Sequence, residues 1–223
     1  MNRICLLCLA LVAVWAAPVL ADDFMPPTYR GAPLSYLAEW EFASQGVPTA
    51  GIAPDYESWV DDDDPTTFLY DKFATHIDVD GDGWQYDPAD GDGGLVNPNR
   101  DGSIGCNVIN WVDQMPIKEL RIQITYIGLA PSITGVTGYV YYGSSIFPDQ
   151  EAYPGDFVCH GDCGEGRLFE DWIILPNPDW EQIEIFVPQG TILDQIYIDS
   201  VSPEPATMAL MGIGTVALLR RRK

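Results

Sequence analysis

Alternation of apolar and polar residues with a period of two is the feature that most limits how this chain can fold. It is clearest at residues 120–126, where Leu, Ile, Ile and Tyr alternate with Arg, Gln and Thr. A side-chain period of two belongs to a β-strand with one buried face. The same reading predicts strands at Tyr36–Phe42, Ile104–Val112, Tyr139–Tyr142, Ile183–Val187 and Ile192–Ile198.

Turn signals recur between these segments, among them Pro54-Asp55, Pro148-Asp149, Pro154-Gly155 and Gln189-Gly190. No stretch of twelve residues in the body has a helical period. Many short strands separated by Pro and Gly turns predict an all-β fold, a single antiparallel β-sandwich of jelly-roll type. We expect Ile127–Gly138 to be a hairpin connection.

Both ends of the chain have the composition of processing signals rather than of the fold. Residues 1–21 have one basic residue, an apolar run at Ile4–Ala17 and small residues before a cleavage point after Ala21, as a signal peptide does. Residues 22–33 then read as a flexible leader, and the sandwich domain is predicted over residues 34–202.

The C-terminal tail has three parts in order: Pro203-Glu204-Pro205, an apolar run of 14 residues at Ala206–Leu219, and the basic cluster Arg220, Arg221, Arg222 and Lys223. As a helix the run covers about 21 Å, short of a hydrocarbon core of about 30 Å. Flanking basic residues that reach the headgroups can close this gap, so we expect a short transmembrane helix with its basic end in the cytoplasm.

These three parts, with Gly212 and Gly214 inside the apolar run, closely resemble the PEP-CTERM sorting signal of exported bacterial proteins. The resemblance implies signal peptidase and exosortase as partners during export. It also implies transient anchoring in the inner membrane and later delivery to the cell surface or the extracellular matrix. The body is similar, more weakly, to uncharacterised PEP-CTERM proteins, which bring no activity with them.

Charge limits the partners of the body. The chain has a net charge of −22, but five of its 11 basic residues and one of its 33 acidic residues lie in the two end segments. The remaining segment keeps 6 basic and 32 acidic residues, a net charge of −26. Such a field repels nucleic acid and anionic lipid and attracts divalent cations.

One segment of the body has a pattern typical of metal ligands. Asp78, Asp80 and Asp82 are followed by Gly83, which fits Asp-x-Asp-x-Asp-Gly, and Asp87 and Asp90 come next. Alternate carboxylates can converge on one cation, and calcium prefers oxygen ligands. We predict a calcium site at these five aspartates. Position twelve of the loop is Ala89 instead of the Glu of an EF-hand, so a solvated acidic loop without metal stays open as an alternative.

Three cysteines remain after the signal peptide. Cys159 and Cys163 can close a small disulfide loop, and pairing of Cys106 with either one is the alternative.

The predicted function is that of a non-catalytic, calcium-stabilised protein with a structural or adhesive role at the surface or in the matrix. A calcium-dependent carbohydrate-binding module that uses Trp84 and Tyr86 is the first alternative, since extracellular polysaccharide is the obvious ligand there. A secreted glycoside hydrolase is the second, because paired carboxylates suffice for that chemistry.

Overall fold

The computed structural model describes residues 26–43, 47–48, 51–60, 68–69, 74–87, 93–112, 117–142, 145–159, 166–175 and 177–203. Within these ranges every regular element is a β-strand and none is a helix. The all-β prediction is therefore confirmed. The signal peptide and the apolar tail helix predicted at the two ends lie outside the described residues.

Fourteen strands make up the described part of the chain. In order they are β1 (Ser35–Trp40), β2 (Tyr56–Trp59), β3 (Phe68–Leu69), β4 (His76–Val79), β5 (Gln85–Tyr86), β6 (Leu95–Val96), β7 (Gly102–Ile109), β8 (Trp111–Val112), β9 (Lys118–Ile127), β10 (Ser132–Tyr142), β11 (Ser145–Cys159), β12 (Arg167–Leu175), β13 (Trp180–Val187) and β14 (Ile192–Val201). All six predicted strands are among them.

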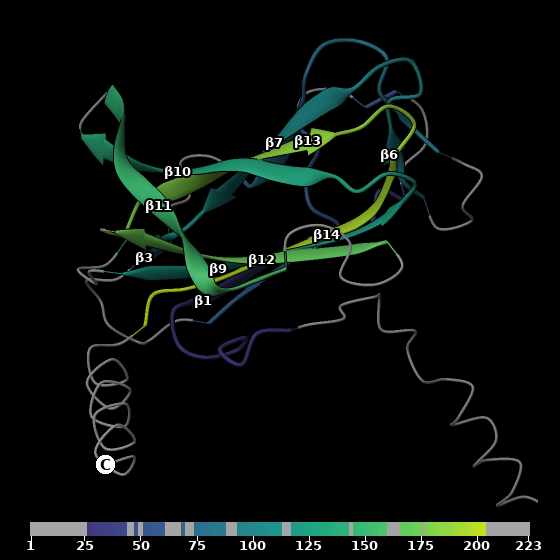
Figure 1. Cartoon of the computed structure of the whole chain (residues 1–223). Coiled ribbons are helices and arrows are strands. Elements are labelled where there is room, and N and C mark those ends of the chain that lie inside the picture. The colour runs from purple at the N-terminus through teal and green to yellow at the C-terminus, as the bar shows by residue number, and fades with distance from the viewer. Residues whose placement is uncertain are drawn as a thin grey trace, which may run out of the picture.

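Eight of these strands form two layers with the jelly-roll order. One layer runs β1-β14-β9-β12 and the other β7-β13-β10-β11, all with antiparallel neighbours. Between β1 and β10, and again from β12 to β14, each of these strands is followed by one in the other layer, whereas β10 and β11 are consecutive strands that pair. Short strands extend the two edges, β2 beside β1 and β4 beside β7. Figure 1 shows β7, β13 and β10 above β9, β12, β14 and β1.

The core lies between the layers and follows the alternation in the sequence. Ile183 of β13 pairs with Cys106 on β7 and Val136 on β10, and all three are buried. In the other layer Ile122 of β9 lies opposite the buried Ile198 of β14. Each such side chain contributes about 1.5–3 kcal/mol on burial, which makes the apolar face of each strand the main source of stability.

β11 is a strand that the turn signals hid. Its first half pairs with β10 and its second half with β12, and the register shifts between Pro154 and Val158. The strand therefore belongs to both layers and closes one side of the sandwich (Figure 1). Proline is tolerated at such bulges and corners, which is why the predicted turns at Pro148 and Pro154 were wrong.

The predicted hairpin at Ile127–Gly138 was also wrong. β9 ends at Ile127 and β10 begins at Ser132, so the connection is only four residues long. The two strands do not pair, because β9 lies between β14 and β12 while β10 lies between β13 and β11. The connection is an arch between layers, with Gly128 at a φ of 112° at its start.

The N-terminal part of the described chain is attached to the last strand. Residues 28–34 form consecutive turns, and the Arg30 guanidinium donates two hydrogen bonds of 2.5 Å to the carboxylate of Asp199 on β14. Tyr29 donates from its hydroxyl to the Asp199 carbonyl oxygen at 3.3 Å. From residue 26 on, the segment predicted as a leader thus lies on the outer face of β14.

Candidate functional site

The aspartate-rich segment from Asp78 to Asp101 contains short strands and is not one long loop. Asp78 lies in β4, and the segment later forms the short hairpin of β5 and β6. The Asp78 carboxylate accepts hydrogen bonds from Gly51 N at 3.0 Å and Asn107 Nδ2 at 3.4 Å. It therefore faces the edge of its own sheet, while the next aspartates belong to the turn that follows.

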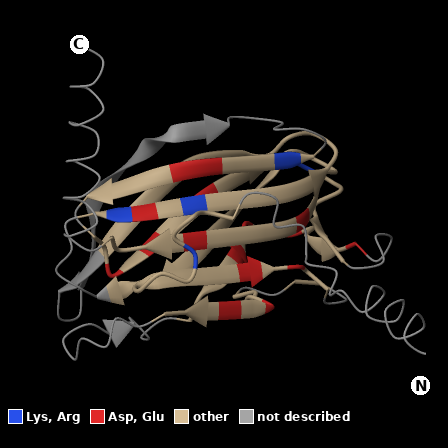
Figure 2. Cartoon of the chain, turned by 90° about the horizontal axis from the view of Figure 1, so that it is seen from below, with Lys and Arg blue, Asp and Glu red and all other residues tan. Residues whose placement is uncertain are grey.

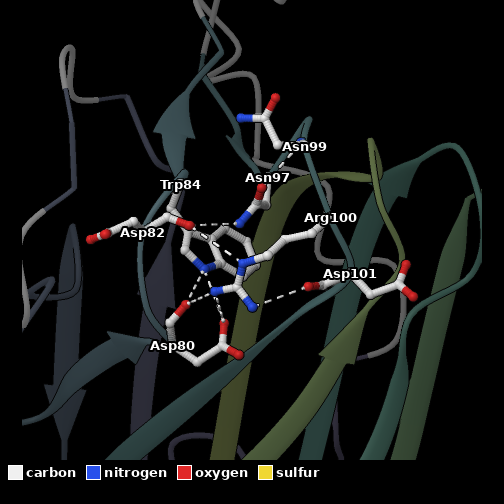
Figure 3. A network of polar contacts seen from close by, with 7 residues as sticks. All are labelled: Asp80, Asp82, Trp84, Asn97, Asn99, Arg100 and Asp101. Atoms are coloured by element: carbon white, nitrogen blue, oxygen red, sulfur yellow. Dashed lines mark hydrogen bonds and ion pairs between the residues drawn. The ribbon is translucent and has the colours of Figure 1, made fainter.

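Arg100 organises that turn (Figure 3). Its Nη2 donates to the backbone oxygen of Asp80 at 2.6 Å and lies 3.5 Å from the Asp80 carboxylate. Nε and Nη1 donate to the backbone oxygens of Asp82 and Asp101, each at 3.5 Å. One guanidinium thus donates to three carbonyl oxygens and lies beside one carboxylate oxygen. Oxygen ligands of these two kinds are also the ones that bind metal cations.

The glycines of the motif allow this close approach. Gly81 and Gly83 have φ angles of 61° and 100°, in the left-handed region that favours glycine. A Cβ on Gly81 would lie 2.7 Å from Arg100 Nη2. The motif therefore forms a sharp turn, and the cation that this turn binds is the Arg100 guanidinium.

Trp84 closes the turn from the core side. Its indole Nε1 donates to the backbone oxygen of Asp80 at 3.1 Å and to the Asp80 carboxylate at 3.2 Å. The ring belongs to the hydrophobic core, is only 3% exposed and would contact a Cβ on Gly102 at 2.5 Å. Trp84 offers no face for a sugar ring to stack on, and this part of the carbohydrate-binding hypothesis was wrong.

The second polar motif, from Asn97 to Gly102, also serves the fold. The Asn97 side chain is buried, and its Oδ1 accepts from the backbone N–H of Asn99 at 3.2 Å as in an Asx turn. The Asp101 carboxylate accepts from the backbone N–H of Gln189 at 2.8 Å. These side chains hold the motif against the turn before β14.

The five predicted calcium ligands are only partly placed by the structure. Asp82 is exposed and Figure 3 shows its carboxylate directed away from Asp80. Asp87 is half-buried, and Asp90 lies outside the described residues. In the part of the chain that the structure describes, no three His, Cys, Asp or Glu side chains form a group that could hold a metal ion. Calcium binding stays a prediction.

Of the three cysteines, only Cys106 has a described side chain. It is a free thiol inside the core, where burial raises its pKa well above the usual value. Pairing of Cys106 with another cysteine was therefore the wrong alternative. Cys163 lies outside the described residues and only the backbone of Cys159 is described, so the Cys159–Cys163 disulfide stays a prediction.

A buried ion pair crosses the core near the start of the tail. Lys118 of β9 and Glu181 of β13 belong to opposite layers, and Lys118 Nζ lies 2.8 Å from Glu181 Oε1 with neither side chain exposed. Burial raises the pKa of the Glu181 carboxyl, and the Lys118 ammonium partly offsets this.

The predicted sorting motif begins where the fold ends. β14 ends at Val201, the backbone N–H of Ser202 donates to the Leu34 oxygen at 3.3 Å, and Pro203 is buried. Ser202 alone separates the last strand from Pro203. Glu204, Pro205 and the basic residues Arg220–Arg222 lie outside the described part. Among the described residues no helix is long and apolar enough to cross a membrane.

Comparison with known proteins identifies one segment. Residues 203–223 match the PEP-CTERM protein-sorting motif. A search of curated proteins finds no match to the chain. The chain therefore carries the tail of an exosortase substrate, which makes it an exported protein associated with the cell envelope. The match begins at Pro203 and does not include the body, so likeness of the body to other proteins of this class stays a prediction.

Proposed function

We propose that the tail delivers a folded jelly-roll domain to the cell surface or extracellular matrix, where the domain has a structural or adhesive role without turnover. In this proposal signal peptidase removes residues 1–21, and the tail anchors the chain in the inner membrane until exosortase acts. The observation that carries the proposal is the direct succession of β14 and the sorting motif at Pro203.

The position of β14 supports delivery of a folded domain. β14 pairs with β1 on one side and β9 on the other, so it is an inner strand of its layer. The layer is complete only when the residues directly before the tail have paired. A tail that holds the chain at the membrane gives the last strand time to pair before release.

Charge supports an extracellular role beside neutral partners. Of the six basic residues of the body, Arg30, Arg100, Lys118 and Arg121 each lie within ion-pair distance of an Asp or Glu. The remaining excess of acid keeps the domain soluble and repels polyanions.

Calcium stabilisation, as a finer part of the proposal, requires one rearrangement. Arg100 already binds the backbone oxygens of Asp80 and Asp82, and its Nη2 lies 3.5 Å from the Asp80 carboxylate. Calcium would have to displace the guanidinium or bind carboxylates further along the segment.

A dose experiment in a bacterium that produces the protein tests the structural role. The gene is deleted and restored under titrated expression, and the cohesion of the matrix is measured against the amount of protein. A structural or adhesive component predicts cohesion in proportion to the protein present. A catalytic role would instead restore the matrix at a small fraction of the normal amount, and the purified protein would release soluble saccharides from it.

A further inference from the structure

The outer faces of the two layers differ in chemistry. On the outer face of the β1-β14-β9-β12 layer, acidic and basic side chains lie on neighbouring strands (Figure 2). Arg30 pairs with Asp199, and Arg121 pairs with Asp171 at 2.6 Å. The segment from residue 28 to 34 lies across β14 on this side. This face is therefore occupied by ion pairs and by the chain itself.

The strands of the other layer carry no lysine or arginine. Among the described residues none occurs in β4, β7, β10, β11 or β13. Because Ile183 and Ile185 of β13 point into the core, Trp180, Gln182 and Glu184, which alternate with the inward residues, point outward. Register places their neighbours on β7 and β10 on the same side. We call this surface the amide face and define it by Asp78, Asn107, Tyr139, Trp180, Gln182 and Glu184.

Two amide side chains lie next to each other at its centre. Asn107 of β7 is directly opposite Gln182 of β13. His76 Nδ1 lies 2.6 Å from the Ala74 carbonyl oxygen, and His76 Nε2 lies 3.2 Å from both Asn107 Nδ2 and the Asp78 carboxylate. Asn107 Nδ2 also donates to the Asp78 carboxylate at 3.4 Å. The nitrogen of the Asn107 amide thus faces His76 and Asp78, and its Oδ1 is left to accept from outside.

Gln182 has the opposite arrangement. Its Oε1 accepts from the Tyr139 hydroxyl at 3.0 Å, so its Nε2 hydrogens remain to donate. This Nε2 leans over Gly105 and would lie 3.3 Å from a Cβ there. Strands in a sheet are about 4.8 Å apart. An acceptor and a donor at that spacing match two neighbouring hydroxyl groups of a sugar.

A row with two glycines forms a recess beside the amides. Register places Gly135, Glu184, Gly105 and Asp78 side by side on β10, β13, β7 and β4. Neither neighbour of Glu184 in this row has a side chain of its own. Gln182 Nε2 reaches over Gly105, whereas on the other side a Cβ on Gly135 would meet only Glu184 Oε2 at 4.0 Å. A carboxylate in a recess accepts hydrogen bonds from hydroxyl groups.

An aromatic pair borders the other side of the amides. Tyr139 and Trp180 are cross-strand neighbours whose rings stack with centroids 4.1 Å apart and an angle of 9° between planes. Both side chains are half-buried. They offer apolar surface next to hydrogen-bonding groups, the combination on which sugar rings settle.

We propose that the amide face is a binding site for a neutral polysaccharide. The amides and Glu184 would bind hydroxyl groups, and the aromatic pair would contact the ring carbons. The two carboxylates and the absence of cations on the face disfavour an anionic polymer. This inference rests on the proposed function and gives it a partner class. It places the sugar contacts on the amide face of β7, β10 and β13 instead of at the acidic turn beside Trp84.

Affinity electrophoresis of the chain with its tail still attached, purified from membranes in mild detergent, tests the site. The gels contain xyloglucan, galactomannan or hydroxyethyl cellulose as neutral polymers and polygalacturonate as the anionic one. We expect at least one neutral polymer to retard the protein and polygalacturonate to have no effect. Calorimetry with that polymer should give binding about tenfold weaker for Gln182→Ala, as expected for the loss of about 1.4 kcal/mol.

Gly135→Val separates binding from folding. The position has no left-handed φ, the added side chain meets open space, and a β-branched residue suits a strand, so melting should not fall. The side chain fills the recess and should abolish retardation. Glu119→Gln on the other layer is the control and should bind like the wild type. Failure of all neutral polymers, retained binding by Gly135→Val or loss of binding in Glu119→Gln would overturn the proposal. None of these results changes the dose experiment on matrix cohesion.

Discussion

Lys118 and Glu181 form an ion pair of 2.8 Å between the two layers of the sandwich, with both side chains fully buried. The pair joins β9 to β13, strands that do not hydrogen-bond to each other. Replacing one partner of a buried pair leaves an uncompensated charge, whereas replacing both with apolar residues removes the desolvation penalty.

Lys118→Met should therefore reduce the free energy of unfolding by about 3–5 kcal/mol. The double variant Lys118→Met/Glu181→Leu should recover most of that loss. Urea denaturation followed by tryptophan fluorescence measures both. A double variant as unstable as the single one would show that the pair does more than neutralise its own charges.

Arg30→Ala should loosen the segment before β1. It removes two hydrogen bonds to a carboxylate on β14, and bonds to charged groups contribute about 1.5–3 kcal/mol each at most sites. Hydrogen exchange should become faster at residues 29–35 and stay unchanged in β7 and β13. Arg30→Lys keeps the charge but cannot make the two parallel hydrogen bonds, so its exchange rates should lie between those of the wild type and of Arg30→Ala. Equal exchange in all three proteins would contradict the attachment.

Stability should rise as the pH falls from neutral toward the ordinary carboxyl pKa of about 4. Burial raises the pKa of the Glu39, Glu119, Glu181 and Asp199 carboxyls, so the folded state binds protons that the unfolded state releases. This stability is fully present below the ordinary carboxyl pKa of about 4 and is lost as the pH rises through the folded values. Melting temperatures measured across this range should show the trend.

High salt is the control for that trend. It screens repulsion among the exposed acids but not the buried groups. The pH dependence should therefore persist in about 0.5 M NaCl, where repulsion between the exposed acids is largely screened. A flat profile in salt would assign the effect to surface charge alone.

Arg100 and calcium should compete for the turn at Asp80 and Asp82. Melting temperatures of the wild type and of Arg100→Ala, measured with calcium and with chelator, test this competition. We expect calcium to raise the melting temperature of the wild type by less than it raises that of Arg100→Ala, because in the wild type calcium must displace the guanidinium or bind carboxylates further along the segment. In Arg100→Ala the backbone oxygens of Asp80 and Asp82 and the Asp80 carboxylate are released. Equal stabilisation of both proteins, lost in Asp80→Ala, would show that Arg100 does not compete with calcium, and no stabilisation of either would contradict calcium binding.

The alternation of side chains was enough to predict the sandwich and six of its eight strands, because one buried face imposes a period of two. The same alternation indicates that Lys118 is buried, because it lies two and four residues before Leu120 and Ile122 and therefore points inward with them. Pairing partners were harder to predict. β11 was hidden because Pro148 and Pro154 resemble turns, and only its place across both layers explains them.

The acidic turn could not be resolved from its own residues. The motif from Asp78 to Gly83 fits a metal loop, but the cation that the structure places there is Arg100, from a segment 18 residues after Asp82. Nor could the amide face be seen in sequence, because Asn107, Gln182 and Gly135 are brought together only by the register of three strands.

The most direct test of the account is the mass of the mature protein recovered from the surface of producing cells. The account predicts a chain that begins after Ala21 and ends near Pro203-Glu204-Pro205, without Ala206–Lys223. Replacing these three motif residues with alanine should leave the tail in place and hold the protein in the inner membrane. Recovery of the surface protein with its tail intact, or unchanged delivery of the alanine variant, would contradict it.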